Sequence, residues 1–141
     1  CLGFLDAVSH KLESVMNDSY LNTDSVCEGL RKIRRNVPDE LLYVILDNAA
    51  YQHCRKVKDC AAELNINLIY LPPYSPNLNL IERLWKFLRS KILANKYYDS
   101  FKQFFDNVHD FLDSLHIVFS DSLDSLFSFN FQCLDSNCCL N

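Results

Sequence analysis

Short apolar runs and helically spaced apolar residues alternate along most of the chain. Short runs bounded by polar or turn residues are typical of strands, whereas apolar residues that recur every third or fourth position indicate helices. The pattern predicts strands at 2–8, 12–16, 41–46 and 66–71, and helices at 22–35, 51–64, 75–94 and 100–117. The run at 41–46 is continuously apolar, which predicts a strand covered on both faces, and 66–71 is interpreted as a second buried strand. The chain is therefore expected to have an α/β fold.

Two of the predicted helices begin with clear capping signals. Asn22, Thr23 or Asp24 can cap the helix at 22–35, because their side-chain oxygens accept hydrogen bonds from free backbone N–H groups. Ser75 can cap the helix at 75–94, with Pro76 at its first position.

Two acidic residues are expected to meet at one edge of the predicted sheet. The strand, helix, strand order over residues 41–71 predicts a parallel pair whose C-terminal ends lie at the same edge. Asp47 ends the first of these strands, and Glu82, which follows after 34 intervening residues, lies early in the next helix. Two converging carboxylates suit divalent metal ions. Simpler roles remain open, because Asp47 and Asn48 can cap a turn and Glu82 can form a capping box with Asn79.

Composition and charge narrow the class of protein. The 141 residues are 49% hydrophobic, which suits one ordered domain, and no run is long enough to span a membrane. The net charge of −4 argues against binding nucleic acid over the whole surface. Basic clusters lie in the first two-thirds of the chain, so any DNA contact is expected there. Seven scattered cysteines predict reduced thiols, and Cys133, Cys138 and Cys139 lack the spacing of a zinc site.

A specific motif follows the last predicted strand. Residues 71–85 read Leu-Pro-Pro-Tyr-Ser-Pro-Asn-Leu-Asn-Leu-Ile-Glu-Arg-Leu-Trp. This segment resembles the catalytic domain of mariner-superfamily transposases, most closely their bacterial insertion-sequence branch, within the Asp-Asp-Glu group. The resemblance covers about residues 1–117 and leaves 118–141 as a C-terminal tail of uncertain structure. It implies a ribonuclease H-like mixed sheet flanked by helices.

The resemblance assigns roles to individual positions. Asp47 corresponds to the second catalytic Asp and Glu82 to the catalytic Glu, and both are implied ligands of two divalent metal ions, magnesium or manganese. Residues that match the surrounding signature, with roles mainly in shaping the loop and helix, are Asn48, Pro73, Tyr74, Ser75, Pro76, Asn79 and Trp85. Two positions depart: Leu80 replaces a frequent Pro, and Gln52 occupies a position where many relatives have His.

One part of the family pattern is missing. Relatives carry a catalytic Asp on a first, central strand, and the run at 2–8 resembles their second strand instead. The chain is therefore expected to lack that strand and the helix-turn-helix region before it. Asp6 is a poor substitute, because using it leaves the fold one strand short. With only two of three carboxylates, negligible cleavage by this polypeptide alone is expected.

By resemblance, this is a fragment of a DNA transposase that cleaves and joins DNA strands in cut-and-paste transposition. Whether the chain itself is an enzyme stays open. The expected partners are transposon ends and target DNA, an upstream transposase fragment and a second copy of the chain, in the bacterial cytoplasm near the nucleoid. Arg83, Lys86 and Arg89 are candidate contacts to DNA phosphates. The alternatives are a non-catalytic remnant or partner subunit, and a phosphoacceptor domain with Asp47 as acceptor.

Overall fold

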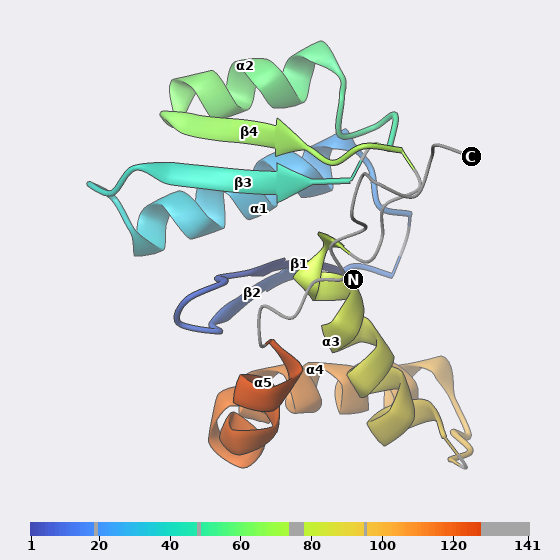
Figure 1. Ribbon diagram of the computed structural model, residues 1–141. Coiled ribbons are helices and arrows are strands. Elements are labelled where there is room, and N and C mark those ends of the chain that lie inside the picture. The colour runs from blue at the N-terminus through green and yellow to red at the C-terminus, as the bar shows by residue number, and fades with distance from the viewer. Residues whose placement is uncertain (19, 48, 74–77, 95, 128–141) are drawn as a thin grey trace, which may run out of the picture.

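The computed structural model describes residues 1–18, 20–47, 49–73, 78–94 and 96–127 (Figure 1). Strands and helices follow one another in a mixed α/β order, as the hydrophobic pattern predicts. The elements in chain order are β1 (Leu2–Leu5), β2 (Leu12–Val15), α1 (Thr23–Asn36), β3 (Leu42–Leu46), α2 (Arg55–Glu63), β4 (Ile66–Tyr70), α3 (Leu80–Leu88), the π-helical η2 (Arg89–Leu93), α4 (Phe101–Val118) and α5 (Ser120–Leu126). None of the helices in these ranges is both long enough and apolar enough to cross a membrane.

The four strands form two separate pairs within the described residues. β1 and β2 are antiparallel, with Leu2 opposite Val15 and Leu5 opposite Leu12. β3 and β4 are parallel, with Leu42 opposite Ile66 and α2 as the crossover between them. The predicted hairpin and the predicted parallel pair are both confirmed.

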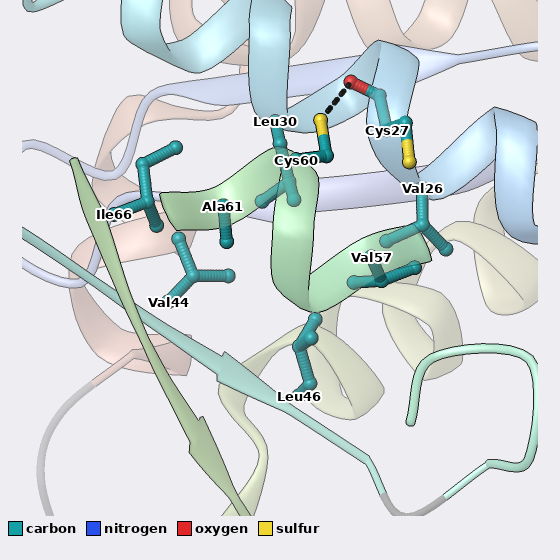
Figure 2. Packing of buried hydrophobic residues seen from close by; sticks show 9 residues of the cluster. All are labelled: Val26, Cys27, Leu30, Val44, Leu46, Val57, Cys60, Ala61 and Ile66. Carbon is teal, nitrogen blue, oxygen red and sulfur yellow. Dashed lines mark hydrogen bonds between the residues drawn. The ribbon is translucent and has the colours of Figure 1, made fainter. Parts of the chain in front are cut away.

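Helix α1 begins where its capping signal predicts. Of the three candidates, Asn22 is the cap: its side-chain oxygen accepts from the backbone N–H groups of Asp24 and Ser25. The buried stripe of α1 packs with α2 and one face of the β3–β4 pair to form the first hydrophobic core. Figure 2 shows this cluster, which consists of Val26, Cys27, Leu30, Val44, Leu46, Val57, Cys60, Ala61 and Ile66.

The expectation that β3 is covered on both faces, and that β4 is likewise buried, is wrong. Val44 and Leu46 are buried in the first core, but Tyr43 and Ile45, which point to the opposite face of β3, are 60% and 52% exposed. Ile69, opposite Ile45 on β4, is 45% exposed. The reason is that α1 and α2 both pack on one face, while α3 contacts β1 instead.

The predicted start of the third helix is also wrong. Ser75 and Pro76 lie outside the described residues, but Asn79 has an extended backbone (φ −97°, ψ 111°) and α3 begins at Leu80. The helix therefore cannot run continuously from residue 75. Asn79 provides the cap instead, because its side-chain oxygen accepts from the backbone N–H of Ile81.

A second hydrophobic core lies on the other side of β1. Helix α4 is capped by Ser100 and matches the prediction for 100–117 closely. It packs with α3 and with α5, which pattern analysis did not find. The buried members of this core are Leu84, Leu88, Ile92, Val108, Phe111, Leu112, Leu115, Leu123 and Phe127.

Candidate active site

Asp47 lies directly after β3, at the C-terminal edge of the parallel pair. The backbone carbonyl of Leu46 accepts from the N–H of Leu71 at 2.9 Å, which extends the pairing to the end of both strands. Because side chains alternate along a strand, Asp47 points away from the face on which Leu46 is buried. Its Oδ1 accepts a hydrogen bond from Nδ2 of Asn79 at 2.7 Å. The strand end is thereby joined to the loop that precedes α3.

Glu82 lies in the first turn of α3. Its backbone N–H donates to the carbonyl of Asn79 at 3.2 Å, and the N–H of Ile81 donates to Asn79 Oδ1, also at 3.2 Å. A carboxylate in this position interacts favourably with the positive end of the helix dipole. Asn79 therefore contacts the side chain of Asp47 and the backbone of Glu82, so the structure brings Asp47 to the helix terminus that carries Glu82.

Both carboxylates are half-buried, and among the described residues neither forms an ion pair. In the same part of the chain, no three or more His, Cys, Asp or Glu side chains gather closely enough to hold a metal ion. Two carboxylates are nevertheless a suitable donor set for Mg²⁺, because this ion is commonly held by one or two carboxylates plus water and substrate phosphate oxygens. Asp47 and Glu82 thus fit a partly built site for a hard cation.

A buried polar cluster that the sequence did not reveal lies beside this edge. The hydroxyl of Tyr70, at the end of β4, donates to the backbone carbonyl of Gln52 at 3.1 Å, and the His53 ring stacks on Tyr70 with 3.7 Å between centroids. Gln52 is 5% exposed. Gln52 Oε1 and His53 Nε2 are both buried without a hydrogen-bond partner among the residues that the structure describes. The only sequence signal was the polar Gln-His pair between apolar segments.

Asp6 serves a different purpose. Its Oδ1 accepts from the backbone N–H groups of Val8 and Ser9, at 2.7 and 3.0 Å, and so closes the turn between β1 and β2. Burial alone would raise the pKa of Asp6, but the hydrogen bonds from Ser9 and Val8 outweigh it and lower that pKa. In Figure 1 this hairpin turn lies on the left of the view and the C-terminal ends of β3 and β4 lie on the right.

The other residues of the motif differ in whether the structure describes them and in how far they are buried. Asn48, Tyr74, Ser75 and Pro76 lie outside the described residues, and Pro73 is exposed. Trp85 packs on β1 as part of the second core.

The three candidate DNA contacts on and after α3 have different surroundings. Lys86 and Arg89 are exposed. Arg83 is half-buried, and its Nη1 donates to the carbonyl of Leu126 at 3.2 Å, which holds the end of α5 against α3.

The family model of the DDE superfamily endonucleases matches residues 2–105. The chain belongs to this family. The match includes Asp47, Asn79 and Glu82 and every described strand, so the acidic edge lies inside the DDE endonuclease domain.

A curated relative carries no functional name. The chain is 37% identical over 83 residues to the uncharacterized protein y4pE/y4sA of Sinorhizobium fredii (strain NBRC 101917 / NGR234). The alignment covers 58% of this chain and 59% of that protein. No solved structure matches the chain significantly.

Proposed function

We propose that this chain is the catalytic part of a DNA transposase of the mariner-like, bacterial insertion-sequence type. Asp47 and Glu82 bind divalent cations that act on a DNA phosphodiester bond. The observation that carries the proposal is the Asn79 bridge, which joins the strand end bearing Asp47 to the helix start bearing Glu82. Membership in the DDE endonuclease family supports the same reaction class.

The chemistry of this site depends on oxygen ligands. When bound, a pair of magnesium or manganese ions activates the attacking oxygen and stabilises the leaving oxygen of the phosphodiester. Asp47 and Glu82 provide carboxylates on two different elements, a strand end and a helix terminus. Two carboxylates leave part of such a two-metal site without a protein ligand, so we propose that the chain alone cleaves DNA negligibly and that a third carboxylate completes the site.

The unpaired edge of β3 supports a place for that third carboxylate. Because the carbonyl of Leu46 pairs toward β4, the alternation of a strand directs the backbone groups of Tyr43 and Ile45 toward the other edge. Within the described residues no strand pairs there.

The edge of β1 that faces away from β2 is also unpaired among the described residues. Asp6 N–H donates to the carbonyl of Lys11 at 2.8 Å, so Gly3 and Leu5, which occupy the alternate pairs, direct their backbone groups away from β2. In Figure 1, β1 and β3 run in opposite directions. Leu2 and Phe4 pack against the same core that buries β3. A single strand between β1 and β3, parallel to β3, would join the two pairs into one ribonuclease H-like sheet and bring its C-terminal end beside Asp47.

A reconstitution experiment tests this proposal. The full chain is assayed for nicking of supercoiled DNA with Mg²⁺ or Mn²⁺, alone and fused to the upstream coding segment that carries an Asp-bearing strand. We expect activity in the fusion only, and its loss in Asp47→Asn and Glu82→Gln, while Asp106→Asn, an exposed acid on α4, keeps it.

The outcomes separate the alternatives. Nicking by the chain alone that Asp47→Asn abolishes would refute the proposed incompleteness. Activity of the fusion that survives Asp47→Asn would refute the proposed site. A folded fusion without any restored cleavage would favour the second candidate, a non-catalytic partner subunit, which the two open strand edges also suit.

We also propose that the exposed basic residues after the acidic edge contact DNA phosphates. Lys86 and Arg89 are available for this role, whereas Arg83 also holds α5. Each lost phosphate contact weakens binding at any sequence and lowers its salt dependence. Lys86→Ala and Arg89→Ala should therefore flatten a plot of log affinity against log salt for terminal-repeat DNA, and Lys102→Ala, at an exposed position on α4, should not.

A further inference from the structure

Asn79 uses both ends of its side-chain amide. Nδ2 donates to Asp47 Oδ1 at 2.7 Å, and Oδ1 accepts from the N–H of Ile81 at 3.2 Å. The opposite orientation of the amide would place oxygen against a carboxylate and NH₂ against an N–H donor. The hydrogen-bond network therefore permits one orientation only.

This arrangement leaves the two oxygens of Asp47 unequal. Oδ1 is held by Asn79, and among the described residues no hydrogen bond or ion pair involves Oδ2. The half-buried contact restricts rotation of the carboxylate, so Oδ2 has a defined direction. Carboxylates that bind metal ions are commonly oriented by such hydrogen bonds to neighbouring groups.

We infer that Asn79 is a positioning residue of the metal site: it holds Oδ1 of Asp47 so that Oδ2 is presented to a divalent cation. The same amide caps α3, which places Glu82 in register with Asp47. This inference rests on the proposed function, because it requires Asp47 to bind a cation. It goes beyond shaping the loop and helix, since it assigns the side-chain N–H a role that capping does not need.

Capping and positioning can be separated by substitution. Ser and Gly are both accepted at helix N-caps, with Gly typically costing only a few tenths of a kcal/mol relative to Asn. Asn79→Ser retains an acceptor for the Ile81 N–H, but its side chain is too short to span both partners. Asn79→Gly removes the side chain altogether. Both variants should fold, and both lose the donor to Asp47.

The test is Mn²⁺ binding to the full chain, followed by the paramagnetic signal of free Mn²⁺, with thermal unfolding measured in parallel. We expect Asn79→Ser and Asn79→Gly to bind Mn²⁺ ~10–100-fold more weakly than the parent chain, as for other partners that orient metal ligands. Asn107→Ser, an exposed amide whose side chain donates to the carbonyl of Gln103 in its own helix, is the matched control and should leave the affinity unchanged. Asp47→Asn should abolish site-specific binding.

The failures are distinguishable. If Asp47→Asn abolishes Mn²⁺ binding while both Asn79 variants bind as well as the parent, Asn79 only caps α3: the inference is overturned and the proposed function stands. If Mn²⁺ binding is absent in the parent chain, or equal in Asp47→Asn, the assignment of Asp47 as a ligand fails and the inference fails with it. A second readout needs no metal: the side-chain NH₂ resonances of Asn79 should shift in Asp47→Asn, and their invariance would overturn the inference.

Discussion

Gly3 of β1 lies directly beneath the indole of Trp85 on α3, so close that a β-carbon at Gly3 would stand 2.8 Å from Cζ2. The other glycine of the chain, Gly29 on α1, has the ring of Phe4 where its own β-carbon would lie. The two glycines thus let helices approach β1 from both faces. The Phe4–Gly29 contact belongs to the first core and the Gly3–Trp85 contact to the second, so β1 lies between α1 and α3.

Gly3→Ala should destabilise the protein by roughly 1–3 kcal/mol, the usual cost of overpacking a core. The indole has to move, and because Trp85 is the single tryptophan, its emission spectrum should shift in the folded state. Urea unfolding followed by circular dichroism measures the loss of stability. In a Trp85→Leu background the cost should shrink, because leucine can turn away. An equal cost in both backgrounds would show that the indole contact is not its cause.

Gly29→Ala should also destabilise, although helix propensity alone predicts a gain of up to about 1 kcal/mol for this change. The reason is that the Phe4 ring occupies the space of the new methyl group. The sign should reverse in a Phe4→Ala background, where propensity alone remains. Chemical unfolding of the four proteins in this double-mutant cycle checks the prediction, and a stabilised Gly29→Ala in the parent chain would contradict it.

Local signals predicted the elements whose ends are determined locally. The cap of α1 at Asn22 and the hairpin of β1 and β2 depend on hydrogen bonds between residues close in sequence. The start of α3 had two competing local signals, Ser75 with Pro76 and the Asn79–Glu82 pair. The structure uses Asn79, whose side chain also has a partner 32 positions away, Asp47, which the local pattern does not contain.

The hydrophobic pattern also could not predict whether the second face of β3 is covered. The apolar run at 41–46 shows that residues suit a covered strand, but it does not show which element covers each face. The exposed Tyr43 and Ile45 side chains depend on where α3 packs, a tertiary choice made by contacts such as Trp85 on Gly3. The placement of Asp47 after a strand and of Glu82 early in a helix, by contrast, was predictable because a family motif specified both residues; their action as a metal site remains a prediction.

Arg34 belongs to a basic run on α1, in the part of the chain where any DNA contact is expected, but its guanidinium has a structural role. In the structure its guanidinium donates to four backbone carbonyls, those of Val37, Pro38, Glu40 and Asn65, at 2.7–3.3 Å. These bonds tie the end of α1 to the segments that precede β3 and β4.

Arg34→Ala should therefore lower the free energy of unfolding by roughly 1–3 kcal/mol, since hydrogen bonds to a charged donor are worth more than neutral ones. Arg35→Ala, an exposed neighbour on the same helix, should change it by about 0.5 kcal/mol or less. Urea unfolding of both variants provides the comparison. Equal losses would mean that general charge on α1, and not the carbonyl contacts, determines stability.

The buried thiol of Cys27 should make the free energy of unfolding depend on pH in the alkaline range. Burial raises the pKa of its thiol to about 11, and the neighbouring Cys60 thiol adds to the effect. In the unfolded chain the same thiol ionises near its ordinary value of about 8.5. Between these two values the unfolded state releases a proton that the folded state keeps, so the free energy of unfolding should fall as pH rises through this interval. Below it, both states hold the proton and the contribution is constant.

Unfolding measured from pH 7 to 11 should show this decline, and Cys27→Ala should reduce its slope because the ionising group is gone.

Thiol reactivity gives an independent check. The hydroxyl of Thr23 and nearby backbone N–H groups lower the pKa of the half-buried Cys54 thiol. At pH 8, iodoacetamide should therefore modify Cys54 well before the buried Cys27, as peptide mapping would show. Equal modification of both in the folded chain would mean that the α1–α2 core opens readily, and an unchanged pH slope in Cys27→Ala would assign the decline to other groups.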